Sequence, residues 1–183
     1  CLDAVRDVAT SMNEKYGLTL EVILVDDGST DGTLDVFRRA QSQESDVLVV
    51  RWISFSRNFG KEASLLAGFS HARGDYVAAM DADMQDPPAL LPKMYELLVS
   101  TGCDNVAARR SSREGESPIR SALSRRFYGV ADGLSDVRFV DGERDYRLMR
   151  RPMVNALLEM VEYNRFTKGM FSWVGFTTEW NSY

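Results

Sequence analysis

Short apolar runs alternate with segments of helical periodicity over the first 108 residues, and this alternation limits the possible folds more than any other feature. The apolar runs contain β-branched residues, as buried strands do, and lie at 20–25, 47–55, 75–80 and 105–108. Apolar residues recur at helical spacing at 2–12, 33–43, 61–72 and 87–98. This order predicts an α/β fold, with a mostly parallel, Rossmann-like central sheet that helices cover on both faces.

Length and composition indicate a single globular domain. The chain has 183 residues, of which 44% are hydrophobic and 27% charged, which suits one core. The net charge of -5 argues against nucleic acid as a partner. Cys1 and Cys103 are too few for a disulfide framework or a zinc site, so we expect a reducing compartment. No apolar run reaches the roughly 20 residues that span a bilayer.

Polar residues cluster directly after three of the predicted strands, at 26–28, 56–61 and 81–86. Ligands of parallel α/β sheets bind beyond the carboxyl ends of the strands. The three clusters are therefore expected to form one binding site.

The sequence Asp-Ala-Asp-Met-Gln-Asp, which begins at Asp81, is the strongest of these signals. Asp81 and Asp83 are one residue apart after a buried strand and can point toward the same small volume. Hard oxygen ligands of this kind suit Mg²⁺ or Mn²⁺ that carries a substrate diphosphate. Such a metal would stabilise the charge on a departing nucleotide diphosphate. An isolated Asp-x-Asp is more often a solvated loop, but its neighbours here favour the metal site.

The motif Val-Asp-Asp-Gly-Ser-Thr-Asp-Gly-Thr closes the first predicted strand. Asp26 or Asp27 can accept a hydrogen bond from the ring N–H of uracil or guanine, or from ribose, while Gly28 allows a tight turn. The alternative is a turn and a helix cap at Asp31 or Thr33. The two interpretations are compatible, since one Asp can bind while another caps.

Two further pairs of charged residues are weaker signals. Arg57 and Lys61 lie near a predicted helix start, where a nucleotide phosphate can bind, although a solvated loop is an equal alternative. Asp145 and Arg147 alternate beside apolar residues and suggest a strand edge that faces a cleft. A surface strand with salt bridges is the alternative.

The clusters, in this order, resemble the polyprenyl-phosphate glycosyltransferases of glycosyltransferase family 2. This branch includes dolichyl-phosphate mannose synthases and bactoprenol glucosyltransferases. The resemblance covers nearly the whole chain, through VDDGSTDGT (25–33), RNFGKEASLLAGFSHARGDYVAAMDADMQDPP (57–88), DYRLM (145–149) and NRFTKGMFSWVGF (164–176).

The resemblance implies a GT-A fold and transfer with inversion at the anomeric carbon. The expected donor is a nucleotide-hexose, with UDP-glucose favoured and GDP-mannose next, and the expected acceptor is undecaprenyl or dolichyl phosphate, for cell-envelope glycan synthesis. The implied metal positions are Asp81, Asp83 and Gln85. The implied nucleotide-sugar positions are Asp26, Asp27, Gly28, Arg57, Lys61, Asp81 and Ala82.

Asp145 falls on the family's catalytic acidic position, and Arg109 matches an arginine after the fifth strand. Arg120 and Ser124 resemble a pair that holds the lipid phosphate, together with Arg109. A phosphate monoester is already largely anionic at neutral pH. We therefore expect Asp145 to orient the acceptor or the metal, rather than to abstract a proton, while Arg109 and Arg120 clamp the phosphate.

The segment 109–126 contains six Arg and two Glu, and we expect it to lie against an anionic membrane surface. A solvated helix face is the alternative. This interpretation places the protein on the cytoplasmic face of the cell membrane, and self-association is compatible with the family. We expect residues 1–183 to be a single catalytic domain, a fragment without the family's first strand and without its C-terminal membrane-associated or transmembrane helices.

Other functions remain open. A family 2 enzyme with a sugar hydroxyl as acceptor is one alternative, although the Gln-x-x-Arg-Trp motif of processive synthases is absent. An inactive scaffold that binds a nucleotide-sugar and recruits a membrane protein is another. A hydride-transferring Rossmann enzyme is disfavoured, because no G-x-G-x-x-G follows the first predicted strand.

Overall fold

The computed structural model describes residues 1–109, 143–160 and 167–183. The predicted order of strands and helices up to residue 109 is confirmed, and most ends differ from the prediction by only a few residues. In chain order the elements are α1 (Leu2–Tyr16), β1 (Leu20–Asp26), α2 (Thr33–Gln41), β2 (Leu48–Ser54), α3 (Lys61–His71), β3 (Tyr76–Ala79), η1 (Pro88–Leu90), α4 (Leu91–Thr101), β4 (Asn105–Arg109), β5 (Glu143–Arg150), α6 (Arg151–Glu159), α7 (Thr167–Trp173) and β6 (Thr178–Ser182).

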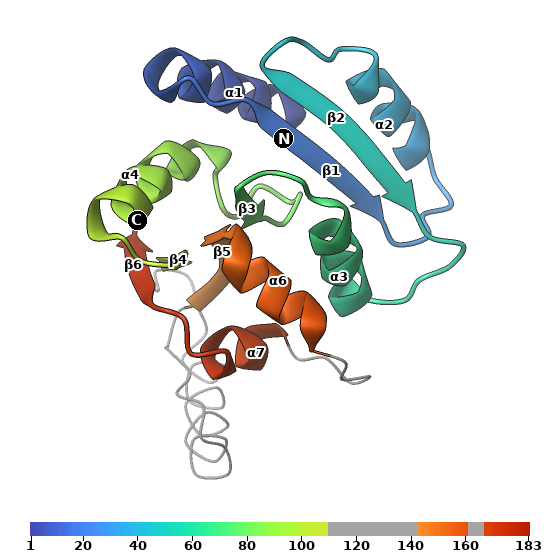
Figure 1. The fold of residues 1–183 in the computed structure, drawn as a ribbon. Helices are drawn as coiled ribbons and strands as arrows, with labels where there is room; N and C mark the ends of the chain where they lie inside the picture. The colour runs from blue at the N-terminus through green and yellow to red at the C-terminus, as the bar shows by residue number, and fades with distance from the viewer. Residues whose placement is uncertain (110–142, 161–166) are drawn as a thin grey trace, which may run out of the picture.

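The described strands form two sheets (Figure 1). In the first, β1 and β2 are parallel. The second has the order β3-β5-β4-β6, in which β5 is antiparallel to both neighbours and β6 is parallel to β4. The α/β class is confirmed, but the prediction of a mostly parallel sheet does not hold around β5. The prediction came from the strand–helix alternation up to residue 108, which carries no information on a strand that enters later.

β5 also corrects the expectation that Asp145 and Arg147 lie at a sheet edge. This strand pairs on both sides, with β3 and with β4. Arg147 is buried, and its guanidinium lies 3.6 Å from the centre of the Phe171 ring. The alternation of charged and apolar residues therefore reflects an interior strand, whose central arginine is covered by α7.

Helices cover both faces of the second sheet, as predicted. On one face, Met149 of β5 packs with buried residues of α3, α6 and α7. On the other, Leu148 and Tyr146 of the same strand pack with Met94 and Leu98 of α4. Neighbouring side chains of a strand point to opposite faces, so β5 contributes to both apolar layers and is held firmly between them.

A third apolar cluster joins α1 and α2 to the β1–β2 sheet, through Val5, Ala9, Ala40, Leu48 and Val50. Met80, directly after β3, packs against this cluster and also against the α4 side of the second sheet. The loop that carries Asp81 therefore starts at the junction of the two sheets. Within the described ranges, no helix is long and apolar enough to cross a membrane.

Candidate functional site

The loops that follow β1 and β2 touch through their backbones at Gly28. This residue has a positive φ of 77°. A Cβ at this position would lie 2.7 Å from the Cα of Arg57, too close for a real contact. Glycine is therefore required both by the backbone conformation and by the close approach of the second loop.

We expect Gly28→Ala to lower the free energy of unfolding by at least about 2 kcal/mol, because it adds an overlap to an unfavourable φ. Gly17→Ala is a matched control, since Gly17 has a φ of 68° but open space around its Cα. The control should cost only about 1 kcal/mol. Urea unfolding of both variants measures the difference, and equal losses would show that the contact with Arg57 is unimportant.

The carboxylate of Asp27 links the same two loops by hydrogen bonds. Its Oδ1 accepts a hydrogen bond from the backbone N–H of Phe59 at 2.6 Å, and its Oδ2 accepts one from Gly60 at 2.8 Å. Gly60 directly precedes α3. The position of the first turn of α3, and so of Lys61, therefore depends on Asp27.

Asp26 is buried at the end of β1. Its carboxylate accepts hydrogen bonds from the backbone N–H of Ser29 at 3.1 Å and from the hydroxyl of Ser54 at 2.9 Å. Hydrogen bonding from Ser29 and Ser54 keeps the pKa of Asp26 below its ordinary value, against the opposing effect of burial. Both candidate base-binding acids thus have partners within the protein, and their contact with a nucleotide stays a prediction.

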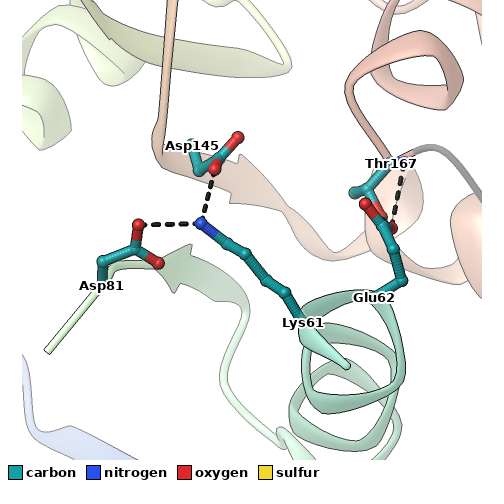
Figure 2. A network of polar contacts seen from close by, with 5 residues as sticks. All are labelled: Lys61, Glu62, Asp81, Asp145 and Thr167. Carbon is teal, nitrogen blue, oxygen red and sulfur yellow. Dashed lines mark hydrogen bonds and ion pairs between the residues drawn. The ribbon is translucent and has the colours of Figure 1, made fainter. Parts of the chain in front are cut away.

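Lys61 joins the two acids that were predicted to carry the chemistry (Figure 2). Its Nζ lies 2.7 Å from Oδ2 of Asp81 and 2.6 Å from Oδ2 of Asp145. Burial alone would lower the pKa of Lys61, but the hydrogen bonds to Asp145 and Asp81 outweigh it, so that the pKa is raised. The ammonium is therefore charged at neutral pH.

The sheet register explains why these two acids meet. β3 and β5 are antiparallel, and their last pair at this end is Ala79 with Arg147. Two residues further in each direction, the same register leads to Asp81 and Asp145. Carboxylates on facing positions of neighbouring strands repel each other, and Lys61 supplies the positive charge between them.

The next residue of α3 makes a second connection. Glu62 accepts hydrogen bonds from the backbone N–H of Thr167, at 3.0 Å, and from its hydroxyl. Figure 2 shows that Lys61 and Glu62 reach in different directions from the same turn of the helix. The start of α3 is thus tied to β3 and β5 through Lys61 and to α7 through Glu62.

The predicted metal residues lie in one loop after β3. Asp83 accepts a hydrogen bond from the backbone N–H of Gln85 at 3.0 Å, and Met84 between them has a φ of 63°. Asp83 and Gln85 are exposed, as is Ala82, while Asp81 is partly buried. Among the residues that the structure describes, no group of three or more His, Cys, Asp or Glu side chains forms a ready metal site.

Support for this loop comes from the last residue of the chain. The hydroxyl of Tyr183 donates to the buried carboxylate of Asp86, and the backbone N–H of Tyr183 donates to the carbonyl of Arg109 at 3.2 Å. The Tyr146 hydroxyl donates to the carbonyl of Pro88, and burial raises its pKa. These contacts hold Asp86 and the start of η1, which follow the exposed residues 82–85.

The remaining candidate residues are placed in part. Arg109 ends β4, which runs parallel to β3 because both are antiparallel to β5. It is therefore at the same end of the sheet as Asp81. Arg57 is exposed, with its guanidinium 4.4 Å from the centre of the Phe59 ring. Arg120, Ser124 and the rest of the basic segment beyond Arg109 lie outside the described residues.

Sequence reasoning missed four residues of this network: Glu62, Asp86, Thr167 and Tyr183. All but Tyr183 lie within motifs that carried the family resemblance, and Asp86 and Glu62 are next to residues with assigned roles. Thr167 is 105 positions from Glu62, and Tyr183 is 97 positions from Asp86. No periodicity or local spacing could pair residues so distant.

The comparison with known families bears directly on these residues. Residues 1–158 match the sequence profile described as glycosyl transferase family 2. The chain belongs to glycosyltransferase family 2. The family predicted from the sequence motifs is thereby confirmed, and the match includes β1, β3 and β5, which carry or precede Asp26, Asp81 and Asp145.

Curated relatives of this family 2 chain include enzymes of bacteria and phages. The prophage bactoprenol glucosyl transferase homolog of Escherichia coli is 38% identical over 160 residues, which cover 87% of this chain and 51% of the relative. The glycosyltransferase CsbB of Bacillus subtilis, a provisional assignment, is 46% identical over 159 residues, covering 85% of this chain and 46% of the relative. The chain thus spans about half the length of the curated relatives it matches.

A solved structure confirms the GT-A-type fold of the family 2 domain. A mannosyltransferase from Pyrobaculum calidifontis, determined with GDP-Man and Mn²⁺, has a TM-score of 0.62 at 18% identity, with 100% of this chain and 52% of that chain covered. At this identity the likeness concerns the fold alone.

Proposed function

We propose that this family 2 domain catalyses the inverting, metal-dependent transfer of a hexose from a nucleotide-sugar to a polyprenyl phosphate. One observation carries the proposal. The structure brings Asp81, from the loop after β3, and Asp145, from β5, onto the same ammonium of Lys61. This shared contact supports one site for the predicted donor-side acid and the predicted catalytic acid. The 38% identity to bactoprenol glucosyl transferases supports a polyprenyl phosphate as the acceptor and glucose as the first sugar to test.

The residues present suit a divalent cation. Asp81, Asp83 and Gln85 offer carboxylate and amide oxygens, the ligands that Mg²⁺ and Mn²⁺ prefer. The two exposed members, Asp83 and Gln85, lie in the same short loop as Asp81. When bound, the metal would stabilise negative charge on the nucleotide diphosphate as it leaves. The Pyrobaculum enzyme was determined with Mn²⁺, so Mn²⁺ is the first cation to test.

Charged residues at the same end of the sheet suit an acceptor that carries a phosphate. Arg109 would hold the lipid phosphate, together with Arg120 and Ser124. Asp145 would orient the acceptor or the metal, because the phosphate is anionic without help from a base. The basic segment 109–126 would meet the lipid at the membrane surface, on the cytoplasmic face.

The test of donor binding is a calorimetric titration of UDP, GDP, UDP-glucose and GDP-mannose, each with Mn²⁺ and with EDTA. We expect one base series, the uridine series first, to bind in Mn²⁺ and not in EDTA. Loss of binding in EDTA follows because the diphosphate and the acidic loop repel each other without a cation between them. Binding that is equal in EDTA, or no binding at all, would contradict metal-dependent transfer.

Transfer itself is measured with labelled UDP-glucose and undecaprenyl phosphate in detergent, with an undecaprenol control. We expect label in the lipid fraction only with the phosphate. Transfer to a sugar hydroxyl instead would support the alternative family 2 enzyme. Donor binding without transfer to either acceptor would support the inactive scaffold that recruits a membrane protein.

A further inference from the structure

Lys61 lies between two acids, in a position where a divalent cation would also bind. Its Nζ is within hydrogen-bond distance of both Asp81 and Asp145. The distance between the two carboxylate oxygens therefore cannot exceed the sum of these two N···O distances. Figure 2 shows the lysine reaching between the acids from the start of α3. This inference rests on the metal dependence of the proposed function.

The ammonium of Lys61 contacts two carboxylates at once. One carboxylate, that of Asp81, lies in the loop after β3, and the other, that of Asp145, lies on β5. Lysine is a single point charge, whereas Mg²⁺ or Mn²⁺ carries two and accepts several oxygen ligands at once. A divalent cation can therefore bind both carboxylates directly, but it can approach Asp81 and Asp145 fully only when the ammonium moves aside.

The backbone of Lys61 is fixed, but its side chain has room to move. Asp27 holds the residue before it through the N–H of Gly60, and Glu62 holds the residue after it through Thr167. The side chain of Lys61 itself is 46% exposed. A long, flexible stem on a fixed turn can swing its charge without any movement of the helix.

We propose that Lys61 is a positioning residue that acts as an internal counter-cation. Before the donor binds, it holds Asp81 and Asp145 together and competes with the divalent cation for them. When a nucleotide diphosphate arrives, it gives the ammonium another anion to pair with, and Lys61 leaves both carboxylates to the cation. Metal and donor then bind cooperatively, and each raises the affinity of the other by the same factor.

Lys61→Met tests the competition, because it removes the charge and keeps most of the length. Free Mn²⁺ is measured by electron paramagnetic resonance, with and without UDP. Without nucleotide, we expect this variant to bind Mn²⁺ about tenfold more tightly than the wild type, and UDP to tighten Mn²⁺ binding less than it does in the wild type. Lys61→Arg keeps the positive charge and should keep the weak binding.

Lys15→Met is the matched control. Lys15 makes an ion pair of the same kind with Glu96, 2.5 Å away, on α1 and α4. Its loss should leave Mn²⁺ affinity unchanged. If Lys61→Met binds Mn²⁺ without UDP only as tightly as the wild type does, or more weakly, the proposal is overturned.

A second measurement needs no variant. The ammonium signals of the four lysines can be followed by ¹⁵N nuclear magnetic resonance during a titration with Mg²⁺ and UDP. We expect the Lys61 signal to shift and the Lys15 signal to stay; a stationary Lys61 signal would contradict displacement. Failure of the proposed function appears differently, as wild-type protein that binds UDP equally with and without metal.

Discussion

Asp145→Asn should lower the rate of sugar transfer by a factor of about 10³, the scale on which enzymes lose rate when one preorganised charged group is removed. Asparagine keeps the shape of the side chain but removes the charge that meets Lys61 at 2.6 Å. The strand itself should stay in place, because β5 pairs on both sides and packs on both faces. The large effect is therefore expected on the chemical step, and not on folding.

Single-turnover transfer measures the rate, and calorimetry of the donor checks that binding survives within a few-fold. Asp35→Asn is the control, since Asp35 makes an exposed ion pair with Arg38 on α2. If Asp145 orients an acceptor that is already anionic, the deficit should be equal from about pH 6 to 9. A deficit confined to low pH would contradict the orienting role and favour proton abstraction.

Asp27→Asn should lower the free energy of unfolding by about 2 kcal/mol, because hydrogen bonds to a charged group contribute about 1.5–3 kcal/mol each and the amide retains only part of them. Both oxygens of Asp27 accept backbone N–H groups, from Phe59 and Gly60. The amide would place an NH₂ group against one of these donors. The β2–α3 loop would then loosen at the point where Lys61 begins its helix.

Urea unfolding measures this loss. The control is Asp31→Asn. Asp31 is exposed, lies with Asp27 between β1 and α2, and accepts a hydrogen bond from the backbone N–H of Thr33 at 2.9 Å. It should cost well under 1 kcal/mol, because Asp31 is exposed and asparagine can accept the same hydrogen bond from the backbone two residues on. If Asp27→Asn leaves stability unchanged but weakens nucleotide binding, the acid contacts the base and does not stabilise the loops.

The elements up to residue 109 could be predicted because each depends on local pattern. The strands are largely apolar runs that polar or charged residues follow, and the helices carry an apolar stripe, so the pattern over a few residues was sufficient. β5 could be located but not oriented. Its neighbours, β3 and β4, lie tens of residues earlier in the chain, and strand pairing over that distance is decided by packing of Met149, Leu148 and Tyr146 on two faces at once.

The proximity of several candidate residues could be predicted, but their contacts could not. Strand ends correctly indicated that Gly28, Asp27, Lys61 and Asp81 would lie close together, since the structure links their loops. The partners could not be foreseen. Asp27, a candidate for contact with the nucleotide, accepts two backbone N–H groups. Lys61, a candidate for contact with a phosphate, bridges two acids. Such choices depend on register and on distances of a few tenths of an ångström.

The position of β5 also has a consequence for how the chain comes to be folded in the cell. β3 and β4 leave the ribosome before β5, which must later insert between them. Until β5 inserts, the edges of β3 and β4 that it will join are unpaired. Strand pairing between segments so far apart in the sequence is slow. Asp145 arrives on that same strand. The nascent chain therefore brings Asp145 to Lys61 and Asp81 only once β5 has entered the sheet, so that a half-folded copy lacks this three-residue network.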